Sequence, residues 1–195
     1  MLAELFPGAR VLMLTRGYRS MVVSSYSQYV RTGGEEDFRG FCAQILRSDN
    51  PWHYDRVAGL YESAFGAANV IVMPYELLRD DAGAFTRTLA GRLGIDDCAA
   101  APERVNAGLS AEELAWYPRL SRAAGRLPGA LRRLYARGAF ANRLRLPIRA
   151  LHRLRPATPV SADAIPPELL DALRPGAERL RTHPLYAPYA ADYLG

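Results

Sequence analysis

The chain has no lysine, so all 25 of its basic residues are arginine, and it has only two cysteines, Cys42 and Cys98. Two cysteines do not make a disulfide framework. Its longest apolar runs fall far short of the roughly 18 residues that a membrane-spanning helix needs. The first seven residues lack the basic start and the sustained apolar region of a signal peptide. We therefore expect a cytoplasmic protein in a reducing setting.

The arginines are unevenly distributed. Residues 119–155 hold eleven arginines and no acid, whereas the residues on either side carry more acids than arginines, for a net charge of +5. Such a segment attracts phosphate, sulfate or an anionic surface. Contact through 119–155 would place the protein at the inner face of a membrane. A solvated helical face in an arginine-rich protein explains the same charges, so both interpretations stay open.

Two short apolar runs predict strands, at Arg10–Thr15 and at Val70–Met73. Each is apolar at consecutive positions and is followed by a helical pattern, which is typical of parallel strands covered on both faces. We expect the two strands to be parallel members of one sheet, adjacent or separated by at most one strand. Two strands alone are too few for a stable parallel sheet.

Helical spacing of apolar residues and capping signals predict the other elements. Helices are expected near 18–31, 38–45, 54–65 and 81–93, and only helices are expected from Ser110 onward, where Ser110 and Glu113 form a capping-box pattern. With 195 residues, 49% of them hydrophobic, the chain fits one domain. We expect residues 1–195 to form it, with an α/β part at 1–109 and a mainly helical part at 110–195.

Arg16 directly follows the first predicted strand, at the edge of an α/β sheet where ligands bind. The helix that follows has one face with Ser20, Ser24, Ser27–Gln28 and Arg31, turned away from its apolar face. A guanidinium, a serine hydroxyl and the first amides of a helix together suit a phosphate group. We expect Arg16 and Ser24 to converge on one concave site. A capped surface helix beside a solvated arginine is the alternative.

Arg16 and Ser24, eight residues apart across a strand-to-helix junction and followed by Tyr26, resemble the 3′-phosphate-binding segment of the phosphoadenosine-phosphosulfate-dependent sulfotransferases. Further segments follow the order seen in bacterial carbohydrate-type members of that family: Phe38, Phe41, Trp52–Tyr54, Tyr61, Phe65–Gly66, Asn69–Val72, Tyr75–Leu78 and Arg104–Asn106. The resemblance covers most of the chain. It implies a P-loop-like three-layer fold in which Arg16 and Ser24 hold the 3′-phosphate of the donor, 3′-phosphoadenosine 5′-phosphosulfate.

The chain departs from that family at its beginning. Such enzymes start with a strand and a loop that grips the donor's 5′-phosphosulfate, whereas no G-x-x-x-x-G-K-S/T or related loop precedes Arg10. We therefore expect that an N-terminal portion is absent, that the P-loop-like fold is incomplete, and that this chain alone binds the nucleotide weakly and transfers little sulfonate. A divergent stand-alone protein is the alternative.

The catalytic residues stay unknown. Glu35, Glu36 and His53 are candidates for the base that deprotonates an acceptor hydroxyl, but nothing in their sequence context singles one out. His152 and His183 have no cysteine or histidine at ligand spacing, so no metal is expected. The resemblance suggests a carbohydrate or glycolipid hydroxyl as acceptor.

A second hypothesis is a binding module whose basic helices, within 119–155, dock on nucleic acid or on an anionic membrane surface. Leu127, Leu131 and Leu134 form one apolar stripe, and Leu144, Ile148 and Leu151 form another. A core-packed helix and an interfacial helix would both have such stripes. No nucleic-acid-binding signature accompanies them, so no specific nucleic acid is expected.

Overall fold

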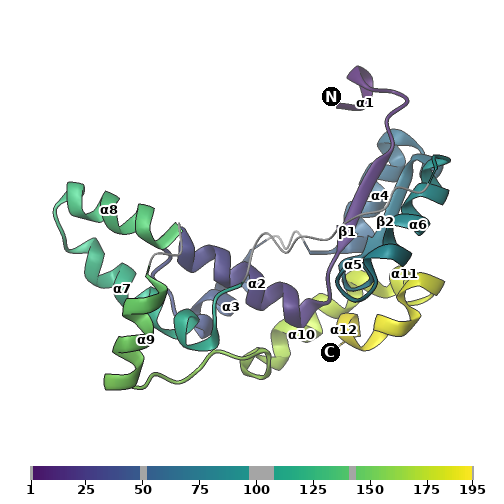
Figure 1. The fold of residues 1–195 in the computed structure, drawn as a ribbon. Coiled ribbons are helices and arrows are strands. Elements are labelled where there is room, and N and C mark those ends of the chain that lie inside the picture. The colour runs from purple at the N-terminus through teal and green to yellow at the C-terminus, as the bar shows by residue number, and fades with distance from the viewer. Residues whose placement is uncertain (1, 49–51, 97–107, 141–143, 195) are drawn as a thin grey trace. The chain divides into compact units, whose positions relative to one another are not determined.

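The computed structural model describes residues 2–48, 52–96, 108–140 and 144–194. The chain divides into two compact units (Figure 1). Unit 1 comprises Met1–Arg19, Asp49–Val105 and Leu170–Gly195, and unit 2 comprises Ser20–Ser48 and Asn106–Leu169. Both units are built from separate stretches of chain, and their boundaries differ from the division at 109/110 that the sequence suggested. The expectation of a single domain stays a prediction. Cys98 and Arg104–Asn106 lie outside the described residues.

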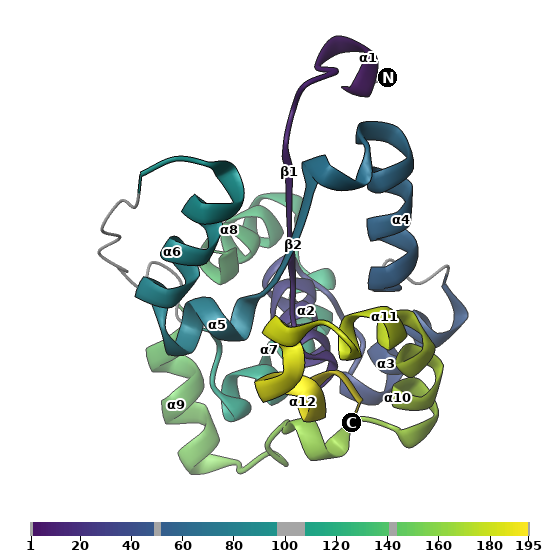
Figure 2. The same cartoon turned by 90° about the vertical axis from the view of Figure 1, so that its right-hand side faces the viewer.

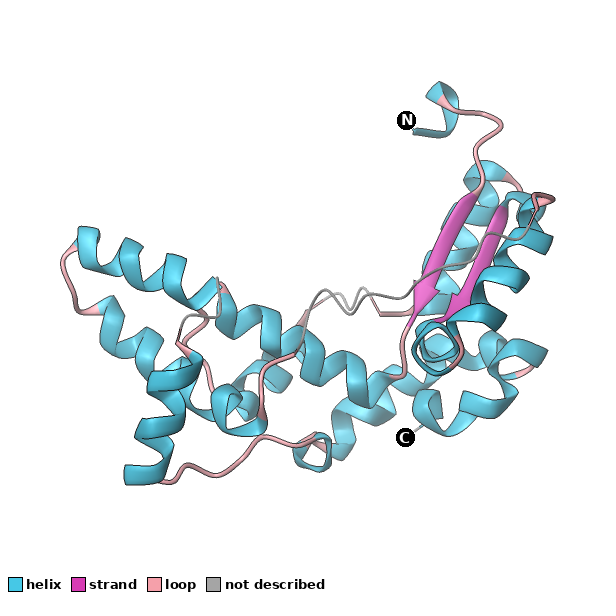
Figure 3. Cartoon of the chain, in the orientation of Figure 1, coloured by secondary structure: helices cyan, strands magenta, loops and turns pink. Residues whose placement is uncertain are grey.

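Unit 1 contains a two-stranded parallel sheet (Figure 3). Strand β1 (Val11–Thr15) pairs with β2 (Val70–Pro74) in a register that runs from Val11 beside Val70 to Thr15 beside Pro74. The sequence prediction of two parallel, adjacent strands is confirmed.

Helix α4 (Tyr54–Phe65) and helix α6 (Ala82–Leu93) lie on opposite sides of the two strands (Figure 2). On the α6 side, Ile71 and Met73 of β2 pack against Phe85. The neighbouring Leu12 and Leu14 of β1 are each 43% exposed. The expectation of a sheet covered on both faces is therefore wrong for β1, because α5 (Tyr75–Asp80) and α6 cover its partner strand and leave the side chains of Leu12 and Leu14 partly exposed.

The rest of unit 1 is helical and includes the end of the chain. Its further elements are α1 (Leu2–Leu5), η1 (Ala67–Asn69), α5 (Tyr75–Asp80), η3 (Arg174–Ala177), α11 (Glu178–Arg181), η4 (Pro184–Tyr189) and α12 (Ala190–Leu194). Arg179 joins α11 to α4: its backbone N–H donates to Asp55 Oδ2 at 2.7 Å, and its guanidinium donates to Glu62 at 2.6 and 2.8 Å.

Unit 2 is helical in its described residues. It contains α2 (Tyr18–Arg31) from Ser20 onward, α3 (Phe38–Arg47), α7 (Ala111–Gly125), α8 (Gly129–Phe140), α9 (Arg145–Leu154) and η2 (Ala162–Ala164), and it includes the start of α10 (Pro167–Leu173). The ring of Tyr26 in α2 packs against Phe38 and Phe41 of α3, with centroids 5.0 and 5.2 Å apart. Trp116 Nε1 of α7 donates to His152 Nδ1 of α9 at 3.3 Å.

Local signals place most helix ends where the sequence predicts them. Ser110 and Glu113 form the expected capping box at the start of α7. Asp81 caps α6, which ends at Gly94 in the left-handed conformation.

Helices with a small parallel sheet confirm the general α/β class. None of the helices in the described ranges combines the length and the apolar character needed to cross a bilayer.

Candidate functional site

Two strand ends of unit 1 meet at one edge of the sheet, where β1 leads into α2 and β2 leads into α5. The last residue of β1, Thr15, is fully buried. Its hydroxyl lies 2.8 Å from the Tyr186 hydroxyl and 2.9 Å from the Tyr193 hydroxyl. The C-terminal segment of the chain is thereby bonded to the end of the first strand.

Glu76 supplies a buried carboxyl group at this edge. It lies in the first turn of α5 and its side chain is only 1% exposed. Its carboxylate accepts a hydrogen bond from the Gly17 backbone N–H at 2.9 Å and another from the Tyr193 hydroxyl at 3.0 Å. A buried carboxylate needs such donors to offset the water that it has lost. The amide that precedes α2 is thus bonded to a carboxylate of the chain itself.

Gly17 is a position where only glycine fits. A Cβ atom added there would lie 2.6 Å from Cβ of Asp192 in α12, closer than carbon atoms can approach. The C-terminal helix therefore packs directly on the backbone of the strand-to-helix junction.

Tyr54 fixes the backbone of Arg16. Its hydroxyl donates to the Arg16 carbonyl oxygen at 2.7 Å and lies 3.4 Å from the Arg16 N–H, which donates to it. The rings of Tyr54 and Tyr18 stack with centroids 5.3 Å apart. Burial raises the pKa of Tyr18, Tyr54, Tyr186 and Tyr193 well above the ordinary value of 10. These hydroxyls are therefore protonated at neutral pH and act as hydrogen-bonding groups rather than as bases.

The Arg16 side chain is the cation that the sheet edge presents next to α5. Its guanidinium carbon lies 4.9 Å from the centre of the Tyr75 ring, at the start of that helix. An arginine stacked on an aromatic face keeps its planar set of N–H donors, which matches phosphate or sulfate oxygens. The structure confirms that Arg16 directly follows the carboxyl end of β1, as the sequence predicts.

Ser24, the other predicted ligand, lies half-buried on α2, within unit 2. The proposed convergence of Arg16 and Ser24 stays a prediction. Two residues of the expected polar face of α2, Ser27 and Arg31, are buried, at 6% and 7% exposure. Arg31 Nε has no hydrogen-bond partner. Helical spacing alone did not reveal how much of this helix is enclosed.

The candidates for a general base belong to different units of the chain. Glu35 and Glu36 are exposed in unit 2, where the Glu36 carbonyl oxygen accepts from the Tyr26 hydroxyl at 3.3 Å. His53 directly precedes α4 in unit 1 and packs so closely on Gly176 that an added Cβ would lie 2.7 Å from its Nδ1. The catalytic assignment stays open. Among the described residues, no three His, Cys, Asp or Glu side chains are grouped as a metal site.

Unit 2 contains a cavity of about 660 Å³. Its walls come from α2, α3, α7 and the segment 158–168, and combine apolar side chains such as Phe38 and Pro118 with Arg119, Arg122 and Asp163. Acidic and basic side chains are both present, so the lining does not select one class of charged ligand. Sequence reasoning did not anticipate this cavity.

Sequence reasoning also missed the roles of Tyr186 and Tyr193, which reach the sheet edge from the other end of the chain. No local pattern marks them, since their partner Thr15 lies 171 and 178 residues away. Glu76 did carry a signal, because a carboxylate two residues after a buried strand lies at the binding edge of a parallel sheet.

Comparisons with protein-family models, with curated proteins and with solved structures found no match. The resemblance to sulfotransferases therefore rests on the motifs of this sequence.

Proposed function

We propose that this chain is a sulfotransferase-family protein that uses 3′-phosphoadenosine 5′-phosphosulfate to place a sulfonate group on a hydroxyl of a carbohydrate or glycolipid. The proposal includes a P-loop-like arrangement for the α/β part of the chain. The general base stays unassigned.

The position of Arg16 is the observation that carries the proposal. It follows a strand of a parallel sheet, its backbone is held by Tyr54, and its guanidinium stacks on Tyr75. Substrate phosphates bind at this edge in α/β folds, where a fixed arginine offers two parallel charge-assisted donors. In the sulfotransferase resemblance, this same residue holds the 3′-phosphate of the donor, and Ser24 assists it.

Binding of adenosine 3′,5′-bisphosphate, measured by calorimetry, tests the proposal. We expect weak binding, because this sequence offers no lysine and no recognisable loop for the 5′-phosphate. Arg16→Ala should weaken it roughly ten- to hundredfold, as expected for the loss of one or more charged hydrogen bonds. Adenosine 5′-monophosphate, which has no 3′-phosphate, should show no such dependence on Arg16.

Arg87→Ala is the matched control, since Arg87 is an exposed arginine on α6 of the same unit. Ser24→Ala and the double variant Arg16→Ala with Ser24→Ala test whether both residues hold one phosphate. If they do, the effects of the two substitutions on binding should be non-additive. The proposal fails if the bisphosphate does not bind, or if Arg16→Ala and Arg87→Ala have equal effects.

A further inference from the structure

The apolar stripe on α8 lies on the outside of unit 2. Leu127 precedes this helix, and Leu131 and Leu134 lie on it at helical spacing; they are 45%, 50% and 66% exposed. A stripe that packed in the core would be buried. The sequence left open whether this helix packs in the core or is interfacial. The exposure of these three leucines excludes a core-packed stripe. We call them the α8 stripe.

Helix α9 has both a buried and an exposed apolar face. Ile148 is fully buried, whereas Leu146 is 77% and Leu154 is 80% exposed. Leu146, Ala150 and Leu154 recur every four residues and so share one face, which we call the α9 stripe. Arg149 and Arg153 lie beside it at the next helical positions and are exposed. The helix therefore presents leucines and arginines together to the solvent.

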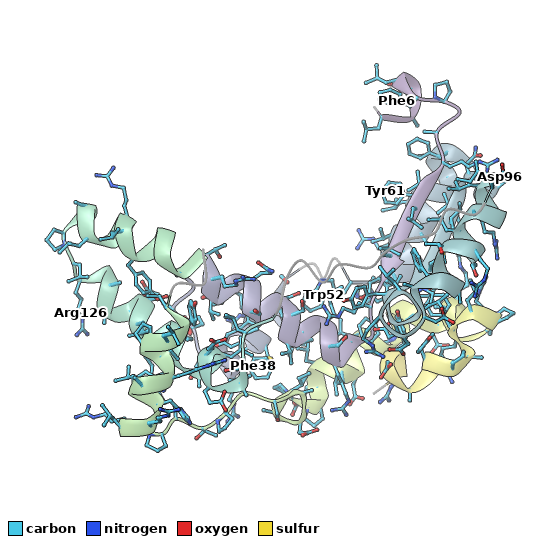
Figure 4. All side chains as sticks on the ribbon, in the orientation of Figure 1. Phe6, Phe38, Trp52, Tyr61, Asp96 and Arg126 are labelled. Carbon is cyan, nitrogen blue, oxygen red and sulfur yellow. The ribbon has the colours of Figure 1, made fainter. Side chains whose placement is uncertain are left out.

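The segment that carries both stripes has arginine as its only type of charged residue. Residues 119–155 contain eleven arginines and no acid, and Arg126, at the turn between α7 and α8, lies among them (Figure 4). The segment favours an anionic partner, because it carries eleven arginines and the carboxylates near them, such as Glu112 near Arg149, come only from other segments. Such a partner must also offer an apolar phase, since exposed leucines gain nothing from a purely polar partner.

We propose that α9 docks on an anionic lipid surface, with the α9 stripe entering the boundary between headgroups and acyl chains. Arginine suits this position, because its long stem lies along apolar surface while its guanidinium stays at the headgroups. The phosphates of nucleic acid could also pair with the arginines, but they would leave the exposed leucines in contact with water. The inference is independent of the proposed sulfonate transfer.

Sedimentation with two kinds of vesicle tests the proposal, using equal parts of phosphatidylcholine and phosphatidylglycerol in one and phosphatidylcholine alone in the other. We expect the chain to bind the anionic vesicles, to release them as salt is raised, and to leave the neutral vesicles free. Arg149→Gln with Arg153→Gln should weaken binding roughly thirtyfold, at about fivefold for each arginine near the surface. Leu146→Ser with Leu154→Ser should weaken it at least about tenfold.

Matched controls come from unit 1. Leu60→Ser removes a leucine that is 62% exposed on α4, and Arg87→Gln with Arg92→Gln removes two exposed arginines from α6. Both controls should leave vesicle binding unchanged. Because all the substituted side chains are exposed, circular dichroism should show that every variant stays folded.

Three outcomes would overturn the proposal. One is equal binding to neutral and anionic vesicles. Another is duplex DNA binding that is tighter than vesicle binding and insensitive to the leucine substitutions, which would assign the arginines to nucleic acid. The third is self-association that these substitutions abolish without changing vesicle binding, which would assign the α9 stripe to a second copy of the chain.

Discussion

Glu76 illustrates how a single buried side chain can hold together segments that are distant in the sequence. Its two carboxylate oxygens accept from Gly17 at the start of α2 and from Tyr193 in the last helix. Without it, the Gly17 N–H and the Tyr193 hydroxyl would each lose an acceptor, and the buried surroundings exclude most of the water that could replace it. The backbone conformation at the end of β1, where Arg16 lies, therefore depends on this carboxylate.

We predict that Glu76→Ala lowers the free energy of unfolding by about 2–4 kcal/mol, since it removes the buried acceptor of two hydrogen bonds. Glu76→Gln should cost less, because an amide oxygen can still accept from Gly17. Urea unfolding monitored by circular dichroism measures both. A change within about 0.5 kcal/mol for Glu76→Ala, as for an ordinary surface residue, would contradict this role.

Sequence predicted the place of Arg16 and could not predict its surroundings. An arginine just past an apolar strand lies at the sheet edge whatever the rest of the fold does, so its position follows from local pattern. The tyrosine partners of Glu76 and Thr15 lie more than a hundred positions away in the sequence. Contacts of that kind depend on how the whole chain packs, and no spacing rule contains them.

Among the elements, those with local signals were predictable. Ser110 with Glu113, Asp81 and Gly94 mark helix ends through their own backbone bonds, and the structure shows each of them in that role. The exposure of Leu12 and Leu14 was not predictable, because an apolar strand has the same sequence whether one or both of its faces are covered. The burial of Ser27 and Arg31 depends on neighbouring elements in the same way.

Helices α4 and α11 are joined by a charged contact whose strength should depend on pH. The hydrogen bonds from Arg179 hold the pKa of the Glu62 carboxyl below its ordinary value near 4.5. A lowered pKa in the folded state means that the unfolded chain binds the proton more readily. The contact therefore stabilises the fold above the unfolded pKa and loses its effect as pH falls through the folded pKa.

We predict that Glu62→Gln reduces stability at neutral pH, and that its difference from the wild-type chain shrinks as the pH is lowered through the acid range. Thermal or urea unfolding at a series of pH values measures this difference. Glu178→Gln is a suitable control, since that exposed carboxylate lies 3.6 Å from Arg181 on the same helix. A difference for Glu62→Gln that stays constant down to the most acidic point would rule out the proposed linkage.

At the scale of the whole molecule, two compact units are assembled from interleaved stretches of one chain. Each unit contains one of the two tryptophans, Trp52 in unit 1 and Trp116 in unit 2. Chains with more than one compact unit commonly unfold in more than one step. The two tryptophans can therefore report on the two units separately.

We predict that single-tryptophan variants unfold with different midpoints in urea. Trp116→Phe leaves Trp52 as the reporter of unit 1, and Trp52→Phe leaves Trp116 as the reporter of unit 2. Adding Glu76→Ala should lower the midpoint seen by Trp52 and leave the one seen by Trp116 nearly unchanged. If both fluorescence signals move together, the two units unfold as one cooperative body and the prediction is wrong.

The edge of β1 that faces away from β2 also bears on how the protein behaves in concentrated solution. Among the described residues, β1 pairs with β2 only, so the backbone amides and carbonyls along its other edge have no strand partner. The strand, Val-Leu-Met-Leu-Thr, has no charge and no proline, the two features that usually prevent one strand edge from adding to another. Its exposed leucines would stabilise such an addition. Intermolecular strand pairing that begins at β1 is therefore the route by which this protein would aggregate.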